Sequence, residues 1–334
     1  MNSKIVVRIT YFTENGRKLY ELLSSKCHGI IFEEIGGASL EEWIKEAFEL
    51  HLPIVFIGAT GIAVRIIAGF VNSKLSDSPV IVIDEKGQNV IPILSGHYGG
   101  SNELAIYLAG ELSTNPIITT ATDINNVFAI DVFAKNNGLR IADSKGIKKI
   151  SSKLLQGESV RFADKTGSRF CGEIPSKVQF SEIEADVIIS DFIENIFTLI
   201  PKRLVLGMGC KKDKDFQELK DFVFEYYTED YLRDNLFAIA TIDAKASEVG
   251  LIKLAQYLGA KLLVYRDIEL EQVPGDFPES EFVKATVGVS NVCERAAIKG
   301  AGLKKRTLEM EKVAKCGMTL AAARREEIII KWQD

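Results

Sequence analysis

The stretch "PIVFIGATGIAVRIIAGF", residues 53–70, decides the class of fold that this sequence can adopt. It opens with an unbroken apolar run that ends at Gly58, which is typical of a strand buried on both faces of a sheet. The residues from 60 to 70 then carry the pattern of a helix. A buried strand that leads through a glycine into a helix is the unit from which parallel α/β sheets are built.

The same alternation of strand and helix fills the first third of the chain. It predicts strands at 4–10, 29–35, 80–84 and 116–119, and helices at 13–26, 39–50 and 101–112. Ser39 and Glu42 stand in the positions of a capping box at the start of the second helix. This order predicts a mostly parallel sheet with helices on both faces.

A second alternation begins at "KRLVLGMG", where we expect a strand to end at Gly207. Asn291 and Glu294 occupy capping-box positions before a late helix. The last two apolar runs, Thr307–Ala314 and Met318–Ala323, predict a β-hairpin around residues 315–317. Between Gly207 and the hairpin, the sequence pattern predicts strands at 236–240 and 261–266 and helices at 213–227, 247–259 and 291–301.

Residues 135–200 differ from both flanks because they are richer in Lys, Ser and other polar residues. They are either a small folded module or an extended connection. The predicted fold class is therefore α/β, with two α/β domains of mostly parallel sheets, residues 1–134 and 201–334, joined by a smaller middle module at 135–200.

Composition narrows the function. The chain has 334 residues, 46% of them hydrophobic, and a formal net charge of −5. The sequence has no basic stripe that would indicate a nucleic-acid partner, and no apolar run has the length of a membrane span. Five scattered cysteines without a CxxC pair argue against a disulfide framework and a structural zinc site. Without a signal-peptide pattern, the expected location is the cytoplasm.

Three glycine-marked junctions between a strand and a helix are candidate ligand sites, because helix N-termini attract carboxylates and phosphates. The first is "FIGATGIAVR". Gly58 and Gly61 would let a ligand approach the backbone, Thr60 could cap the helix, and Arg65 lies within the first turns. The same residues also fit an ordinary capped helix with a solvated arginine.

The second junction is "LSGHYGGSNELA", residues 94–105, which holds one of only three histidines in the chain. Gly96, Gly99 and Gly100 allow unusual backbone angles. The imidazole of His97 can change charge near neutral pH. Asn102 and Glu103 open the following helix. The alternative is a histidine that is satisfied by a neighbouring carbonyl group.

The third junction, "VLGMGCKKDK", contains Gly207 and Gly209 but lacks the third glycine of a dinucleotide fingerprint and is not a phosphate-binding loop. Cys210 is expected to be a small buried hydrophobe, because no histidine lies in this half of the chain to activate it.

Two further strand ends are rich in hydroxyl groups. Such ends bind carboxylates, and they also form ordinary turns and caps. They carry Thr119, Thr120, Thr122 and Asp123 in the first half, and Thr241, Asp243, Lys245 and Glu248 in the second.

These motifs together resemble one family, the CbiG-type cobalt-precorrin-5A hydrolases of anaerobic cobalamin biosynthesis. The resemblance covers most of the chain outside the middle region, and it departs from the family pattern after Cys210, where Lys212, Asp213 and Lys214 replace a small turn. The matching blocks are residues 58–69, 79–105 and 117–125, followed by 204–212, 240–259, 288–302 and 319–325.

The resemblance implies a hydrolase that opens the δ-lactone of a cobalt-bearing tetrapyrrole, releases acetaldehyde and forms cobalt-precorrin-5B. The cobalt belongs to the substrate, so no cofactor or protein metal site is implied. Lactone opening needs a base and a stabilised oxyanion. Our hypothesis makes His97 the base, oriented by Glu103 or Asp123, with the oxyanion at the amides of Gly99 and Gly100.

The remaining candidate residues would bind the substrate, an anionic small molecule, with the C-terminal domain closing the other side of the cleft. They are Thr60, Gly61, Arg65, Gly96, Asn102, Thr119, Thr120, Thr122, Gly207, Gly209, Lys245 and Glu248.

Two alternatives compete with the hydrolase. One is a non-catalytic tetrapyrrole carrier or partner of the pathway methyltransferases, and the other is a nucleotide-dependent enzyme, which the missing phosphate loop disfavours. A homodimer and transient contacts with other cobalamin-pathway enzymes stay open.

Overall fold

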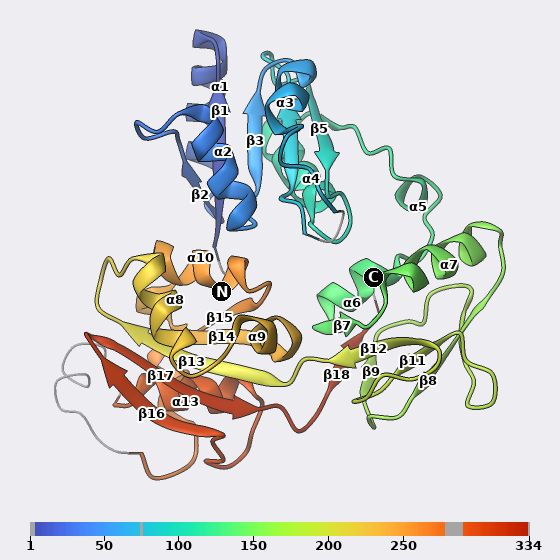
Figure 1. Ribbon diagram of the computed structural model, residues 1–334, viewed down its shortest axis with the longest axis vertical. Coiled ribbons are helices and arrows are strands. Elements are labelled where there is room, and N and C mark those ends of the chain that lie inside the picture. The colour runs from blue at the N-terminus through green and yellow to red at the C-terminus, as the bar shows by residue number, and fades with distance from the viewer. Residues whose placement is uncertain (1–3, 74–75, 278–289, 333–334) are drawn as a thin grey trace. The chain divides into compact units, whose positions relative to one another are not determined.

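The computed structural model describes residues 4–73, 76–277 and 290–332 and divides the chain into two compact units between Asn126 and Val127 (Figure 1). The boundary that the sequence placed at residue 134 falls inside helix α6, Ile130–Asn136. The first two residues of the block 288–302 lie outside the described residues.

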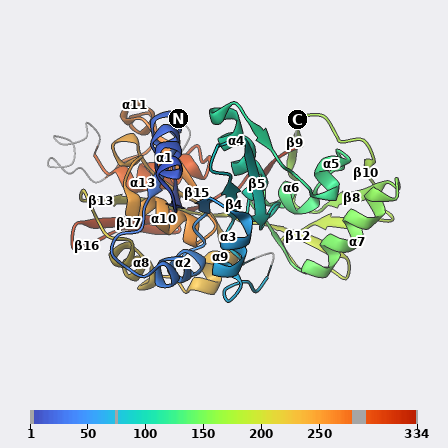
Figure 2. The same cartoon turned by 90° about the horizontal axis from the view of Figure 1, so that it is seen from above.

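The N-terminal unit is a six-stranded sheet in the order β2-β1-β3-β4-β5-β6. Figure 2 shows α1 and α4 on one face of this sheet and α2 and α3 on the other. Its strands are β1 (Ile5–Tyr11), β2 (Ile30–Glu33), β3 (Ile54–Ile57), β4 (Val80–Ile83), β5 (Asn89–Leu94) and β6 (Asn115–Pro116). Its helices are α1 (Glu14–Lys26), α2 (Leu40–Glu49), α3 (Thr60–Ile67), α4 (Ser101–Leu112) and the short α5 (Ala121–Ile124).

The direction of the chain reverses once across this sheet. Strands β1 to β4 are parallel, β5 is antiparallel to β4, and β6 is parallel to β5, so that the arrows of β3 and β5 point in opposite directions in Figure 1. Val80 pairs with Leu94 and Ile83 with Val90. The carboxyl ends of β5 and β6 therefore lie at the edge of the sheet opposite to those of β1, β3 and β4.

Local capping follows the sequence at some helices and departs from it at others. The capping box of Ser39 and Glu42 is confirmed. The expectation that Thr60 caps α3 is wrong, because the helix begins one residue earlier and Ala59 is its N-cap, without a side-chain hydrogen bond. The capping box at Asn291 is also wrong: Asn291 has a φ of 54°, and its amide donates to the Glu294 carboxylate instead of accepting from the backbone.

The middle region is a folded module, not an extended connection. Its five-stranded sheet has the order β10-β8-β11-β12-β7, in which β7 alone is antiparallel to its neighbour among the described strands. Its elements are β7 (Leu139–Ile141), α7 (Ser144–Leu155), β8 (Val160–Asp164), β9 (Arg169–Cys171), β10 (Val178–Phe180), β11 (Val187–Ile189) and β12 (Phe197–Pro201).

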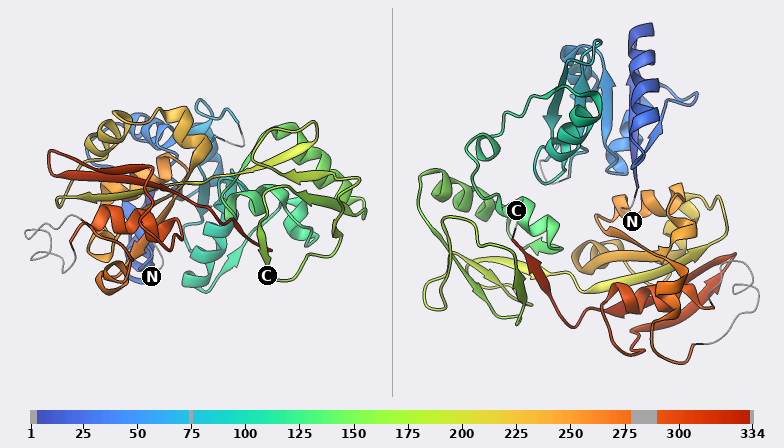
Figure 3. Two further views of the ribbon diagram at one scale, coloured as in Figure 1. Left: turned by 90° about the horizontal axis from the view of Figure 1, so that it is seen from below. Right: turned by 180° about the vertical axis from the view of Figure 1, so that it is seen from behind.

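The C-terminal sheet has the order β15-β14-β13-β17-β16, with α13 on one face and α8 and α10 on the other (Figure 3). The predicted hairpin around residues 315–317 is confirmed. Its strands are β13 (Leu204–Cys210), β14 (Leu236–Ile242), β15 (Lys261–Tyr265), β16 (Met310–Lys315) and β17 (Met318–Arg324). Its helices are α8 (Phe216–Phe224), α9 (Glu229–Asn235), the 3-10 turn η1 (Asp243–Lys245), α10 (Val249–Tyr257), α11 (Asp267–Glu271) and α13 (Val292–Gly300).

Strand β13 does not end at Gly207, as the sequence suggested. The strand continues to Cys210 because β17 pairs with it along its whole length, from Leu204 with Arg324 to Cys210 with Met318. The predicted α/β class is confirmed. Parallel pairings predominate in the N-terminal and middle sheets, whereas the C-terminal sheet is mixed, because β17 is antiparallel to both β13 and β16. Across residues 4–73, 76–277 and 290–332, no helix combines the length and the apolar character that crossing a membrane requires.

The last described strand, β18 (Ile329–Lys331), leaves the C-terminal sheet and pairs with β9 of the middle module (Figure 3). Trp332, only 3% exposed, follows it into the core of that module. Its indole stacks between the rings of Phe133 and Phe170, at centroid distances of 4.9 and 5.6 Å. The end of the chain therefore supplies a central part of the core of the middle module.

We expect Trp332→Ala to destabilise the middle module by about 3–5 kcal/mol, because it removes a buried aromatic side chain and leaves a cavity. Hydrogen exchange should accelerate in peptides from β8 and β12 and stay unchanged in β1 and β3. Trp332→Phe, which keeps a stacked ring, is the matched control and should lose much less protection. Equal exchange in the alanine variant and the wild type would contradict this role.

Candidate active site

The glycine turn between β5 and α4 is tightly wound. Ser95 and Gly100 both have positive φ, 57° and 92°, and the carbonyls of Ser95 and Gly96 accept from the first two amides of α4. A Cβ on Gly99 would lie 2.4 Å from the Ser95 Cβ, and one on Gly96 would lie 2.8 Å from an oxygen of Asn102. Side chains at these positions would force the turn open.

This turn presents His97 to two side chains from the short helix α5, which follows β6. The imidazole Nε2 lies 2.7 Å from Asp123 Oδ2 and 2.9 Å from the Thr122 hydroxyl. The side chain of His97 is 15% exposed and that of Asp123 is 40% exposed. Because a carboxylate oxygen only accepts, we assign the ring hydrogen to Nε2, which makes Nδ1 the basic nitrogen of the neutral ring.

Asn102 holds the carboxylate in place from the first turn of α4. Its buried amide donates to Asp123 Oδ2 at 2.9 Å and to the Thr120 hydroxyl at 3.0 Å. Five of the residues that the sequence singled out thus meet at one edge of the sheet. We call this group the histidine cluster: His97, Asn102, Thr120, Thr122 and Asp123.

The reversal between β4 and β5 explains why these residues meet. Strand β6 pairs parallel to β5, and the Ile117 amide continues this pairing by donating to the Val90 carbonyl. The chain after β6 therefore runs toward the same edge as the end of β5. Polar residues that follow two adjacent parallel strands come together there.

The structure separates other predicted residues from this cluster. Thr60, Gly61 and Arg65 follow β3 and so begin at the opposite edge of the sheet, and the Arg65 guanidinium folds back on the Gly61 carbonyl at 3.3 Å. Glu103 is exposed on α4. Within the described residues the carboxylate that contacts His97 is that of Asp123, not Glu103.

In the second unit, Gly207 is a packing residue. It is buried in β13, where a Cβ would lie 1.8 Å from the Cys293 carbonyl oxygen of α13. The glycine lets this helix lie directly on the strand. The expected substrate-binding role of Gly207 therefore stays a prediction, as does that of Gly209, which is only half-buried, beside Thr319.

Lys245 and Glu248 face each other near the end of β13. Their side chains form an ion pair at 3.6 Å, and Glu248 also accepts from the Asp213 amide at 3.0 Å. The pair therefore closes the turn that follows β13. Burial raises the pKa of the nearby Cys210 thiol to about 11, so this sulfur stays protonated at neutral pH and is a poor nucleophile.

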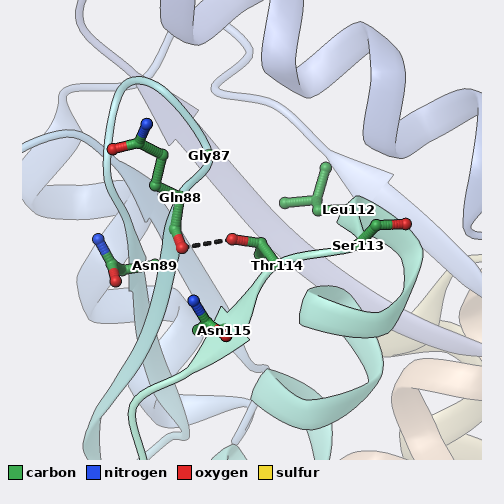
Figure 4. A pocket seen from close by; sticks show the side chains of 7 residues that line it. All are labelled: Gly87, Gln88, Asn89, Leu112, Ser113, Thr114 and Asn115. Carbon is green, nitrogen blue, oxygen red and sulfur yellow. Dashed lines mark hydrogen bonds between the residues drawn. The ribbon is translucent and has the colours of Figure 1, made fainter.

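A shallow polar hollow that the sequence did not signal lies at the other edge of the N-terminal sheet, between the β4–β5 turn and the end of α4 (Figure 4). Its volume is about 580 Å³. Figure 4 shows the Thr114 hydroxyl donating to the Gln88 carbonyl across it. It is lined by Gly87, Gln88, Asn89, Leu112, Ser113, Thr114 and Asn115.

Known proteins match the chain along most of its length. Residues 42–123 match the family described as cobalamin synthesis G N-terminal, residues 128–194 the cobalamin biosynthesis central region, and residues 204–323 the cobalamin synthesis G C-terminus. These matches, in this order, define a protein of cobalamin synthesis.

The relatives make the family specific. The cobalt-precorrin-5A hydrolase of Salmonella typhimurium is 36% identical over 76% of this chain and 77% of its own. The enzyme of the same name from Priestia megaterium is 28% identical over 86% and 82%. A solved structure, a putative cobalamin biosynthesis protein G homolog from Sulfolobus solfataricus, covers 96% of this chain and 97% of its own at 24% identity and a TM-score of 0.43.

The chain belongs to the cobalt-precorrin-5A hydrolase family. The resemblance seen in its sequence blocks is thereby confirmed, and so is its class as a hydrolase.

We expect Gly99→Ala to destabilise the N-terminal unit by roughly 1–3 kcal/mol, because the added methyl group collides with Ser95. The control is Gly110→Ala on α4, where a Cβ meets nothing within 4 Å. This control should stabilise the helix by roughly 0.5–1 kcal/mol. Thermal unfolding followed by circular dichroism measures both. The same melting temperature for the two variants would rule out the tight turn.

Cys210→Ser should leave the hydrolase activity near that of the wild type, because a thiol with a pKa of about 11 is protonated at neutral pH. In the wild type, iodoacetamide should label the exposed Cys316 well before Cys210, as measured by mass spectrometry of the peptides. Rapid labelling of Cys210 together with an inactive serine variant would reinstate it as a nucleophile.

Proposed function

We propose that this chain hydrolyses cobalt-precorrin-5A at the histidine cluster, opening the δ-lactone and releasing the two-carbon fragment as acetaldehyde. Family membership supports the substrate and the reaction. The observation that supports the residues is the contact of His97 with Asp123, held by Asn102, in a turn whose glycines admit no side chain.

In the first step, Nδ1 of His97 takes a proton from a water molecule as the oxygen attacks the lactone carbonyl. A positioned general base contributes about 10²–10⁴ in rate. Asp123 accepts from the opposite ring nitrogen, so it fixes the tautomer and stabilises the imidazolium that forms. Thr122 and Asn102 limit the rotation of this pair.

The negative charge on the lactone oxygen needs donors. The amides of Ser101 and Asn102 are already occupied by carbonyls of the turn. Within the described part of the chain, no backbone acceptor lies at the distance and angle of a good hydrogen bond from the amides of Gly99 and Gly100, so these are the donors that we assign to the oxyanion. Such donors contribute about 10²–10³ in rate each.

The second step breaks the ester bond and then the carbon–carbon bond that holds the two-carbon fragment. Breaking the ester C–O bond yields a carboxylate and frees a hydroxyl on the two-carbon fragment. Loss of the hydroxyl proton and cleavage of the carbon–carbon bond then release acetaldehyde, and the bonding electron pair stays on the macrocycle. The proton that His97 gained can be returned to the leaving oxygen.

In this reaction the cobalt ion stays with the substrate, and no resident metal is needed. The reaction takes place in the cytoplasm, and its substrate is an anionic small molecule, not a nucleic acid or a membrane. Arg65, Thr60 and Gly61 are not part of this catalytic proposal, since their junction lies at the other edge of the sheet.

His97→Ala should lower acetaldehyde release by about 10²–10⁴, because the base is lost. Asp123→Asn should also cause a large loss, because an amide no longer favours the productive tautomer. Glu103→Gln is the matched control with the same change of charge and should retain near-normal turnover.

The assay supplies purified protein with cobalt-precorrin-5A and reduces the released acetaldehyde with alcohol dehydrogenase, following the consumption of NADH. Full activity of the His97 variant would refute the assigned base. A large loss in the Glu103 variant with an active Asp123 variant would reverse the carboxylate assignment. Tetrapyrrole binding without release by the wild type would favour the carrier.

A further inference from the structure

Basic side chains gather within the second unit, where the middle module meets the C-terminal sheet. Strands β13, β14 and β15 begin at this edge and β17 ends there. Lys202 and Arg203 directly precede β13, Lys261 begins β15, and Arg325 directly follows β17. We call these four residues the cationic seam.

Two of these charges are held by neutral groups. The Arg325 guanidinium lies 3.8 Å from the centroid of the Phe237 ring, and the Lys261 ammonium lies 5.1 Å from it. Arg325 is only 8% exposed, and it donates to the Lys202 carbonyl at 3.3 Å. Lys261 donates to the Asn136 carbonyl at 2.6 Å. Ring faces and carbonyls bind cations without neutralising them.

Among the described residues, few carboxylates lie near the cationic seam. The Arg203 guanidinium donates two hydrogen bonds to the Asp191 carboxylate, one to each oxygen. Asp234, about half exposed, lies 3.4 Å from Arg140 of β7. The Arg140 Nε is nevertheless a buried donor that makes no hydrogen bond within the described residues.

The titration of the cations agrees with this imbalance. Burial lowers the pKa of Lys202 to about 8, against the attraction of Asp234 and with the repulsion of Arg233 and Arg140. A lowered pKa in a basic group means that its charged form lacks solvation or a partner.

The pKa is also lowered at two other basic residues of the seam, Arg325 and Lys261. Burial, with repulsion from Arg203, lowers the pKa of Arg325 to about 10. Burial, with repulsion from Arg325 and Lys331, also lowers the pKa of Lys261. An anion placed here would relieve both the desolvation and the repulsion.

We propose that the cationic seam binds the carboxylate groups of a small anionic ligand. Arginine and lysine side chains are the groups that recognise carboxylates, and here they are partly desolvated before the ligand arrives. The carboxylates could come from the side chains of a tetrapyrrole, a source that rests on the proposed function, or from a free polycarboxylate. The seam lies in a different unit from the histidine cluster, so the two sites can be tested separately.

The first test uses citrate as the probe on the full chain, with sodium chloride of equal ionic strength as the reference. A ligand that binds the native state raises its melting temperature. We expect citrate to raise the melting temperature of the wild type above the reference. Lys202→Met and Lys261→Met should weaken the apparent citrate affinity by about tenfold or more, because each removes one charge. Lys304→Met, at an exposed lysine, is the matched control and should bind like the wild type.

The second test needs no variant that must fold. An anion that stabilises the charged form of Lys202 raises its pKa, so citrate binding slightly above pH 8 should take up protons. Calorimetry in two buffers with different ionisation enthalpies measures this uptake. Uptake by the wild type supports the proposal. Citrate binding without any uptake of protons contradicts the proposed contact of the anion with Lys202.

Uroporphyrin, a metal-free porphyrin with acetate and propionate groups, separates the two sources. If uroporphyrin competes with citrate for the wild type, and both methionine variants bind uroporphyrin more weakly, the seam binds tetrapyrrole carboxylates. If citrate binds and uroporphyrin does not, the ligand is a free polycarboxylate. No effect of either anion, or equal binding by the wild type and both variants, overturns the inference. If acetaldehyde release persists in that case, the proposed function stands without it.

Discussion

The antiparallel pairing of β5 with β4 is the constraint on which the candidate site depends. The turn that makes it is stabilised by Asp84, whose carboxylate accepts from the backbone of Lys86 and Asn89. Burial alone would raise the pKa of this carboxyl, but these hydrogen bonds, with one from the backbone of Gln88, hold it below its usual value. Gly87 supplies the positive φ of 67° that closes the turn. With this reversal, the strand that precedes His97 ends at the edge opposite to the ends of β1, β3 and β4.

Every contact of the histidine cluster follows from that reversal. Strand β6 pairs with β5 and has the same direction, so the short helix α5, which carries Asp123, reaches the turn that carries His97. Helix α4 starts at the same edge, and Asn102 in its first turn is buried where it can donate to both Asp123 and Thr120. The glycines of the turn keep the backbone close enough for these short side chains to meet. The polar network thus depends on the sheet, and not on any long flexible side chain.

The second unit depends on two features: the close approach of α13 to β13, and the return of the end of the chain to the middle module. Gly207 allows α13 to lie against β13, which completes the core of the C-terminal sheet. The chain then leaves that sheet, and β18 with Trp332 completes the middle module. Asn137 fixes this return, since its amide donates to the Lys331 carbonyl and its oxygen accepts from the Lys331 amide. The same junction gathers the basic residues at the starts of β13 and β15.

The sequence by itself determined the α/β class, nearly all of the long helices and the hairpin at 315–317, and it singled out the glycine turn with His97, because periodicity and turn chemistry are local properties. It also revealed the family, because ordered blocks survive divergence. It did not determine that β5 reverses, that Arg65 and His97 belong to opposite edges, or that Asp123 and not Glu103 contacts the histidine. Nor did it show that Gly207 serves packing or that Trp332 returns to the middle module. Those features were decided only by the tertiary structure, because they depend on which strands pair and in which direction, and pairing joins residues that lie far apart in the chain.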